Sequence, residues 1–341
     1  MIKEKGINMT VGILGAGTWG IALARMLVIH GNEVKVWSAI EQEIDYLDCN
    51  RKHPNLANMV IPSSIVFTKS IEEACNRDIV VFAVPSIYIR STIRSAASFL
   101  GNYSIIVDVA KGIERDSLNT MSEIITQELE RYRKDNPIVV LSGPTHAEEV
   151  AEDMPTAIIS SSTDYKAAKQ VQDVFTNEFF RVYTNNDVRG IELCGAIKNV
   201  IALATGIATG LGYGDNAKAA LITRGMAEIT RLGNAMGCNK DTFYGLAGIG
   251  DLVVTAMSKH SRNNMAGQLI GQGYTVDEAK SKVGMVVEGL NTLPAAVQLA
   301  NKYDVDMPIV FTVNNIIAHH MDPRDAVEFL MNRDKKEEKP Y

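Results

Sequence analysis

The segment VGILGAGTWG, residues 11–20, constrains this chain more than any other part of its sequence. A short apolar run is followed at once by Gly15, Gly17 and Gly20, and then by the helical pattern IALARMLVIHG. In a strand–loop–helix unit such glycines permit a tight turn, close approach of the backbone to a pyrophosphate, and close helix–strand packing. The helix N-terminus adds free N–H groups and positive charge. The segment predicts a dinucleotide site; the alternative is merely a tight turn.

The first half of the chain alternates apolar β-type runs with helical patterns. Unbroken Val/Ile runs such as DIVVFAV and YSIIVDV are typical of strands buried on both faces of a parallel sheet. We therefore predict an α/β domain over residues 1–187, with a doubly wound, mostly parallel, Rossmann-like sheet. Its strands are expected at residues 10–14, 33–37, 65–67, 78–83, 104–109, 137–141, 156–160 and 179–183.

A second domain is predicted because 341 residues exceed what one ordinary domain holds. From Val188 to Leu330 there is no convincing strand pattern, and Ala-, Gly- and Leu-rich segments follow helical periodicity. We expect an all-helical domain over residues 188–332, followed by a charged tail over residues 333–341.

Charge and cysteine content narrow the functional class. Lys and Arg number 34 against 40 Asp and Glu, and the net charge of −6 gives no general attraction to nucleic acid or an anionic membrane. The cysteines, without a CxxC pair, are expected to be reduced in a cytoplasmic protein. They are Cys49, Cys75, Cys194 and Cys238. The histidines lack metal-ligand spacing, so no metal is expected.

No targeting or membrane segment is expected. The first nine residues, MIKEKGINM, have no apolar core and do not resemble a signal peptide. No apolar run is expected to reach the ~18 residues of a membrane helix, because glycines interrupt the richest one, residues 199–214.

The identity of the dinucleotide stays open at this stage. The second strand ends at Trp37-Ser38 without the Asp or Glu that usually binds the ribose hydroxyls, and Glu41 follows only later. No arginine suited to a 2′-phosphate occurs before Arg51. Both NAD and NADP therefore remain candidates.

Lys198 is the only charged residue between Leu193 and Leu211. Its neighbours three and four positions away on a helix are small or apolar: Cys194, Gly195, Ile201 and Ala202. No group on that face can pair with it, so desolvation should lower its pKa and suit it to proton transfer. Small residues are expected to leave an open lane beside it: Gly195, Ala202, Gly206 and Gly210. The alternative is a lysine that extends its ammonium to the surface.

Two further motifs follow predicted strands, where ligands of doubly wound sheets bind. Lys111 follows SIIVDVA; alone, it is equally well explained as a solvated loop residue. In SGPTHAEEV, Thr145 and Glu148 have the spacing of a capping box, so Thr145 is expected to start a helix that also attracts anions.

Three motifs in the helical half carry polar side chains. Asp251 lies in the glycine-rich turn GLAGIGD, and Glu288 lies beside flexible backbone in GMVVEG. Ser261, Arg262 and Asn263 form a run of donors, of which Arg suits two-point phosphate binding. The alternative for the run is a surface turn.

Taken together, the motifs resemble the bacterial-type NAD(P)-dependent glycerol-3-phosphate dehydrogenases. The resemblance runs in order from about Thr10 to Leu330, through GAGTWG, VPS, AKGIE, SGPTHAEEV, ELCGAIKNV, GDNAKAALITRG, AGIGDLVVT, HSRN and GMVVEG. It implies reversible hydride transfer between NAD(P) and dihydroxyacetone phosphate, giving the phospholipid precursor sn-glycerol 3-phosphate. It also implies a homodimer that associates through the helical domain.

The resemblance also implies residue roles. Lys198 would exchange the proton, Lys111 would polarise the carbonyl, and Asp251 would position Lys198. Substrate-binding residues would be Lys111, Gly143, Thr145, Lys198, Asp251, Thr255, Ser261, Arg262 and Asn263. Cofactor-binding residues would be Gly15, Gly17, Thr18, Trp19, Gly20, Lys111, Ala147, Arg262, Val286 and Glu288.

Departures and rival interpretations accompany the resemblance. Ile40 stands where many members have an Arg suited to a 2′-phosphate, and the residues before Met9 resemble an extension. One rival is a 3-hydroxy acid dehydrogenase of the same architecture, which would need a carboxylate-binding group instead of HSRN. The other is a nucleotide sensor without catalysis, which would need neither Lys198 nor Asp251.

Overall fold

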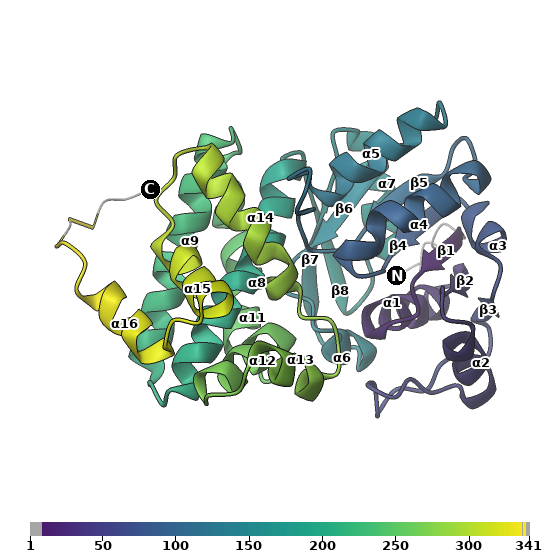
Figure 1. Ribbon diagram of the computed structural model, residues 1–341. Helices are drawn as coiled ribbons and strands as arrows, with labels where there is room; N and C mark the ends of the chain where they lie inside the picture. The colour runs from purple at the N-terminus through teal and green to yellow at the C-terminus, as the bar shows by residue number, and fades with distance from the viewer. Residues whose placement is uncertain (1–8, 336, 339–341) are drawn as a thin grey trace. The chain divides into compact units, whose positions relative to one another are not determined.

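The computed structural model describes residues 9–335, 337 and 338 (Figure 1). The predicted N-terminal extension and the end of the predicted charged tail lie outside the described residues. The described chain divides into two compact units. The first contains the residues up to Ala110 together with Met121–Val188, and the second contains Lys111–Thr120 together with the residues from Arg189 on. Lys111 therefore belongs to the same unit as Lys198.

The first unit is built on an eight-stranded sheet in the order β3-β2-β1-β4-β5-β6-β7-β8. Neighbouring strands are parallel except β6 and β7, which are antiparallel. The predicted doubly wound, mostly parallel sheet is confirmed, and all eight expected strands are present with ends shifted by no more than one or two residues. The strands are β1 (Thr10–Leu14), β2 (Glu33–Trp37), β3 (Val66–Thr68), β4 (Ile79–Phe82), β5 (Ile105–Asp108), β6 (Ile138–Ser142), β7 (Thr156–Ser161) and β8 (Phe180–Asn185).

Successive side chains of a strand point to opposite faces of the sheet, so the apolar residues of the sheet enter two separate cores. In β4, Ile79 and Val81 join one buried cluster, whereas Val80 and Phe82 join another. Because both faces are buried, these strands read as unbroken apolar runs. The helices of this unit are α1 (Thr18–Ile29), α2 (Glu41–Asn50), α3 (Ile71–Cys75), α4 (Ile89–Ala96), α5 (Met121–Arg131), α6 (Ala147–Ala151) and α7 (Tyr165–Phe175).

The second unit is helical, with a single isolated β-bridge, Ile113 to Thr120, among its described residues. Its elements are α8 (Val188–Gly210), α9 (Asp215–Ala235), α10 (Lys240–Phe243), the π-helical turn η3 (Leu246–Gly250), α11 (Asp251–Met257), α12 (Arg262–Gly271), α13 (Val276–Val283), α14 (Glu288–Lys302), α15 (Pro308–His319) and α16 (Pro323–Met331). Helices α9, α11, α12 and α14 pack against α8 (Figure 1).

Helix α8 corrects two expectations. It is long and apolar enough to cross a membrane, since its glycines do not interrupt it, but its most apolar window is wholly buried in the protein. The open lane is also wrong at Gly206 and Gly210, because α12 fills it. A Cβ atom at Gly206 would lie 2.2 Å from the Asn264 carbonyl oxygen, and one at Gly210 would lie 2.2 Å from that of Gln268. The glycines serve close helix packing.

Candidate functional site

The glycine-rich loop joins β1 to α1. Gly15 has φ +123°, and a Cβ atom there would lie 2.6 Å from the Ala83 carbonyl oxygen. A Cβ atom at Gly20 would lie 2.1 Å from the Gly15 carbonyl oxygen, so α1 packs directly against the loop. At Gly17, by contrast, a Cβ atom would meet nothing within 4 Å. The three glycines thus serve the turn, the helix packing and an open approach to the backbone, which is the division of roles that a dinucleotide loop requires.

The start of α1 is free to receive an anion. Gly17 is the N-cap and makes no side-chain cap bond, and the first turn contains no acidic residue. The first N–H groups of a helix have no partner within the helix, so they and the helix dipole favour a phosphate group. Thr18 is buried and Trp19 is half-buried. The loop residues therefore fit the pyrophosphate of a dinucleotide.

The segment after β6 differs from its prediction. Helix α6 begins at Ala147, its N-cap is His146, and no side chain caps it. The expected capping box of Thr145 and Glu148 is wrong, because the helix starts two residues after Thr145. The Thr145 hydroxyl instead donates to the Gly143 carbonyl oxygen over 3.2 Å.

The second unit brings four of the predicted residues into one cluster. The Lys198 Nζ atom lies 2.5 Å from Asp251 Oδ1 and 2.5 Å from the Thr255 hydroxyl. The Lys111 Nζ atom lies 2.7 Å from the other carboxylate oxygen, Asp251 Oδ2. Asp251 and Thr255 are one turn apart on α11, so the same helix face presents both to Lys198.

Burial sets the electrostatics of this cluster. Lys198 is 4% exposed and Asp251 is 1% exposed. Desolvation, assisted by the nearby Lys111 ammonium, lowers the pKa of Lys198 to about 7, while Asp251 opposes that change. The pKa of Asp251 is lowered although burial alone would raise it, because two ammonium groups flank the carboxylate. Lys198 can therefore gain or lose a proton near neutral pH beside a carboxylate that stays ionised.

Two details of this cluster differ from the sequence analysis. The predicted desolvation of Lys198 is present, but its counter-charge comes from α11, 53 residues along the chain, and helical spacing around Lys198 cannot reveal such a partner. The predicted glycine-rich turn is present as the π-helical turn η3, but Asp251 lies directly after this turn, as the first residue of α11.

The HSRN motif forms the start of α12. Ser261 is its N-cap and accepts a hydrogen bond from the Asn264 N–H, so the surface-turn alternative is wrong for this segment. Arg262 is exposed, and among the described residues its side chain makes no hydrogen bond or ion pair. A free guanidinium beside a helix start is suited to a phosphate.

Asn263 connects the motif to α8, the helix that carries Lys198. Its amide nitrogen donates to Asn199 Oδ1 over 3.0 Å, and its amide oxygen accepts from the Gly289 N–H over 2.8 Å. Asn199 and Asn263 are buried. Asn199 was not predicted from the sequence, although an amide directly after a lysine on an apolar helix is an available signal. Val286 and Glu288, half-buried, lie just before and at the start of α14, next to this network.

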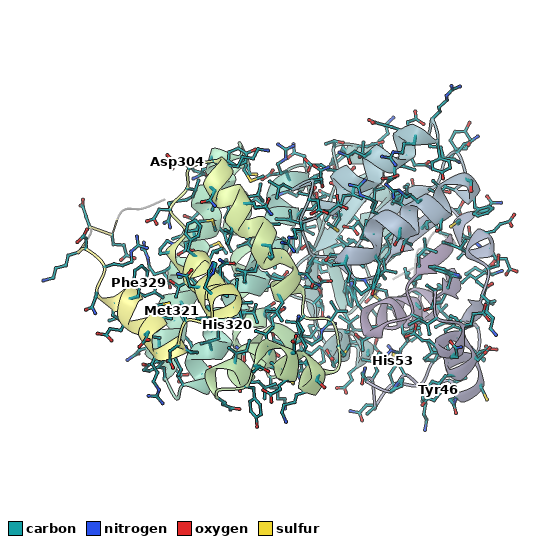
Figure 2. The ribbon with its side chains drawn as sticks, viewed as in Figure 1. Tyr46, His53, Asp304, His320, Met321 and Phe329 are labelled. Atoms are coloured by element: carbon teal, nitrogen blue, oxygen red, sulfur yellow. The ribbon has the colours of Figure 1, made fainter. Side chains whose placement is uncertain are left out.

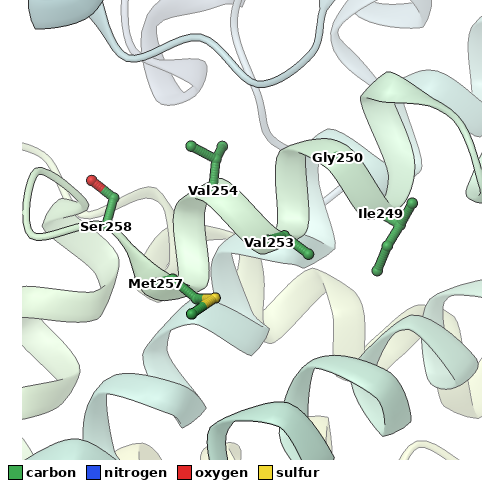
Figure 3. Close-up of a pocket in the computed structure, with 6 residues that line it drawn as sticks. All are labelled: Ile249, Gly250, Val253, Val254, Met257 and Ser258. Carbon is green, nitrogen blue, oxygen red and sulfur yellow. The ribbon is translucent and has the colours of Figure 1, made fainter. Parts of the chain in front are cut away.

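An apolar pocket of about 550 Å³ lies along α11 (Figure 3). Its lining consists of Ile249, Gly250, Val253, Val254, Met257 and Ser258. Neither Lys198 nor Asp251 lines it, and its side chains lack the charge that a phosphorylated substrate needs. Among the described residues there is no cluster of three or more His, Cys, Asp or Glu that could hold a metal ion.

Comparisons with known proteins match both halves of the chain. Residues 10–168 match the model of the NAD-dependent glycerol-3-phosphate dehydrogenase N-terminus, and residues 187–328 match that of the C-terminus. Glycerol-3-phosphate dehydrogenase [NAD(P)+] 2 of Lactobacillus delbrueckii subsp. bulgaricus is 60% identical over 331 residues, which cover 96% of this chain and 98% of the relative. The Bacillus subtilis enzyme is 50% identical over 333 residues, 96% of this chain and 95% of that enzyme.

A solved structure agrees with these matches. The crystal structure of glycerol-3-phosphate dehydrogenase from Coxiella burnetii superposes with a TM-score of 0.91 at 35% identity. The match covers 96% of this chain and 99% of that chain.

Proposed function

This chain belongs to the NAD-dependent glycerol-3-phosphate dehydrogenase family, and from that premise we propose its function. It catalyses the reversible, NAD(P)-dependent reduction of dihydroxyacetone phosphate to sn-glycerol 3-phosphate. One observation carries the proposal: a buried lysine with a pKa of about 7, held between a carboxylate and a hydroxyl. A nucleotide sensor without catalysis has no use for such a group.

The cofactor is held by the β1–α1 loop. Gly17 and Thr18 present backbone N–H groups to the pyrophosphate, and Gly15 and Gly20 keep the loop close to the sheet and helix. Further contacts come from Trp19, Lys111, Ala147, Arg262, Val286 and Glu288. When bound, the nicotinamide supplies or accepts the hydride at carbon 2 of the substrate.

Lys198 moves the proton. In oxidation its neutral amine accepts the proton of the substrate's 2-hydroxyl group, and in reduction its ammonium returns that proton. Asp251 fixes Nζ through Oδ1, and Thr255 fixes it from a second direction. During reduction, negative charge grows on the carbonyl oxygen of the substrate. The ammonium of Lys111, which is held by the second carboxylate oxygen of Asp251, stabilises this charge.

The phosphate of the substrate is bound at the start of α12. Arg262 supplies a charge-assisted contact, and the Ser261 hydroxyl, which accepts from Asn264, can still donate its own proton to an anion. Asn263 keeps this helix start attached to α8 through Asn199. Gly143 and Thr145, after β6, complete the substrate contacts.

The proposal also includes the cellular compartment of the enzyme and its oligomeric state. The enzyme works in the cytoplasm, where the four cysteines stay as the free thiols that the structure shows, and supplies the glycerol backbone of phospholipids. It forms a homodimer through the helical unit, on which apolar side chains such as Val253 and Met257 are exposed. Light scattering that gives the mass of a monomer would contradict the dimer.

The direct test follows the absorbance of the reduced nicotinamide with dihydroxyacetone phosphate, using NADH and NADPH side by side. Oxidation of either cofactor establishes the reaction. The ratio of the two kcat/KM values measures the preference between NADH and NADPH in a chain that has Ile40 where many members have Arg. If neither cofactor is oxidised, while a 3-hydroxy acid supports reduction of NAD or NADP, the rival dehydrogenase is correct instead.

A further inference from the structure

The carboxyl end of β2 is fixed against the glycine-rich loop. Strand β2 lies beside β1 in the sheet, with Trp37 paired to Leu14, and the Gly15 N–H donates to the Trp37 carbonyl oxygen over 2.8 Å. The next residue, Ser38, therefore lies beside the loop at the carboxyl edge of the sheet. In doubly wound sheets the adenosine ribose of a bound dinucleotide lies at this point, and an acidic side chain there hydrogen-bonds its 2′-hydroxyl group.

Ser38 connects this strand end to α2. The residue is 6% exposed, and its hydroxyl accepts a hydrogen bond from the Ile40 N–H over 3.2 Å and donates to Glu43 Oε2 over 2.6 Å. Glu43 belongs to the first turn of α2, a helix that Figure 2 marks with the label of Tyr46. The two hydrogen bonds of the Ser38 hydroxyl hold the Glu43 carboxylate at the end of β2.

The second oxygen of this carboxylate is available to a ligand. Glu43 is half-buried, and within the described part of the chain its Oε1 atom makes no hydrogen bond. A carboxylate oxygen accepts from a hydroxyl group but has no proton to donate to a phosphate. Glu43 therefore suits the 2′-hydroxyl group of NAD and not the 2′-phosphate of NADP. No acid was expected here from the sequence, because Glu43 lies on the helix and not on the strand.

The charges around α2 also disfavour a 2′-phosphate. The helix contains four acidic residues and no basic one; the acids are Glu41, Glu43, Asp45 and Asp48. Lys69 and Arg51, basic residues that contact this helix, are held by its carboxylates, at 2.8 Å from Asp45 and 2.5 Å from Asp48 respectively. The N-cap residue, Ile40, is 58% exposed and apolar, so it offers no charge to a phosphate.

We propose that Glu43, held by Ser38, selects NAD over NADP: its Oε1 atom accepts a hydrogen bond from the 2′-hydroxyl group of the adenosine ribose, and its charge repels a 2′-phosphate. The inference rests on the proposed function, since it needs a dinucleotide at the glycine-rich loop. Glu43 lies on the adenosine side of the cofactor site, so it takes no part in hydride or proton transfer.

Glu43→Gln tests this contact with little change of shape. The amide oxygen can still accept from Ser38, while the amide nitrogen can donate to a 2′-phosphate and no longer repels it. Glu41→Gln is the matched control, because it is the same substitution in the same turn of α2. Residues two apart on a helix do not face each other, and Glu41 lies 3.6 Å from Lys69.

The measurement is the Kd for NADH and for NADPH by isothermal titration calorimetry. We expect the wild type to bind NADH at least about ten-fold more tightly than NADPH. Glu43→Gln should reduce this ratio roughly ten-fold, because the Kd for NADH rises and the Kd for NADPH falls. Glu41→Gln should keep the ratio of the wild type. Ser38→Ala, which frees the Glu43 carboxylate, should reduce the ratio by a smaller factor than Glu43→Gln.

The outcomes separate the two proposals. A wild type that binds NADPH as tightly as NADH overturns the inference alone, as does a Glu43→Gln variant whose two Kd values change by the same factor, which is what a merely structural role predicts. Equal loss of preference in Glu41→Gln would assign the effect to the net charge of α2, and an unchanged ratio in Ser38→Ala would remove Ser38 from the proposal. A wild-type protein that binds neither NADH nor NADPH overturns the proposed function, and the inference with it.

Discussion

Lys198 Nζ lies 2.5 Å from Asp251 Oδ1, inside a helical unit in which both residues are buried. The carboxylate is shared, because its other oxygen lies 2.7 Å from Lys111 Nζ. One negative charge thus serves two ammonium groups, and Lys198, the more deeply buried of the two, has the lowered pKa. Loss of its proton leaves the Lys111–Asp251 pair intact, so the cluster is neutral when Lys198 is uncharged and carries one net positive charge when Lys198 is protonated.

Lys198→Met tests the proton role. Methionine has a similar length and no ionisable group, and Asp251 keeps Lys111 as its partner. We expect kcat to fall by at least about 100-fold, because proton transfer by a positioned group is worth that much, with the Kd for NADH within about two-fold. Stopped-flow absorbance measures the first quantity and calorimetry the second.

Lys280→Met is the control for that variant. Lys280 lies on α13 with an exposed side chain, and its Nζ atom is 3.8 Å from Asp277 Oδ1. The substitution is chemically the same, but Lys280 does not belong to the cluster of Lys198, Asp251 and Lys111. Its kcat should match the wild type. Near-normal turnover of Lys198→Met would remove the proton role from Lys198.

The pH dependence should be opposite in the two directions. Oxidation of sn-glycerol 3-phosphate needs neutral Lys198, so kcat/KM should rise as pH increases through about 7 and then level off. Reduction of dihydroxyacetone phosphate needs the ammonium form, so kcat/KM should fall over the same range. Initial rates from pH 5.5 to pH 9 measure both limbs.

Asp251→Asn gives a directional check on this profile. The carboxylate raises the pKa of Lys198, so its removal should move the midpoint of the residual activity to lower pH. A midpoint that moves to higher pH would show that a group other than Lys198 controls the profile.

Arg262→Ala tests the phosphate contact. The guanidinium is exposed and free of partners within the described residues, so its removal should leave folding unchanged. We expect the KM for dihydroxyacetone phosphate to rise roughly 10- to 100-fold, with a smaller change in kcat, because a charge-assisted hydrogen bond is lost. Arg324→Ala, an exposed position on α16, is the control. A change confined to cofactor affinity would place Arg262 on the dinucleotide instead.

Features that depend on residues close together in the sequence were predictable from local sequence patterns. The strands of the sheet were predictable because each is an apolar run between turn residues, and β1 and β2 have the expected ends. The membership of the family, carried by motifs such as ELCGAIKNV, is confirmed. The desolvation of Lys198 was predictable because its own helix contains no other charged residue after Glu192.

Features that depend on contacts between distant segments were not predictable in this way. The partner of Lys198 comes from α11, and the glycines of α8 accommodate α12. The capping box at Thr145 failed because the start of α6 depends on the backbone after β6.

A second buried titratable group gives a prediction about stability. Glu228 on α9 is 1% exposed and accepts hydrogen bonds from the Ile309 N–H over 2.7 Å and the Val310 N–H over 3.1 Å, at the start of α15. Burial raises the pKa of Glu228 to about 7, although these N–H groups and Arg231 favour the charged form. The mechanism does not use this carboxyl group, so its titration reports on folding alone.

The direction in which the free energy of unfolding changes with pH follows from proton binding to Glu228. Between the ordinary pKa of 4.5 and about 7, folded protein holds a proton on Glu228 that unfolded protein has released, so the free energy of unfolding falls as pH rises through this window. The loss should approach roughly 3 kcal/mol, and Glu228→Gln should abolish it. Urea unfolding followed by circular dichroism at pH 5 and pH 7.5 measures the difference. Glu278→Gln is the control that should leave the pH dependence between pH 5 and pH 7.5 unchanged, because the capping box lowers the pKa of Glu278 and its stabilising contribution is already complete above the ordinary pKa of 4.5. Parallel pH dependences for wild type and Glu228→Gln would mean that Glu228 is ionised in the folded protein throughout, with the N–H groups of Ile309 and Val310 fully offsetting its burial.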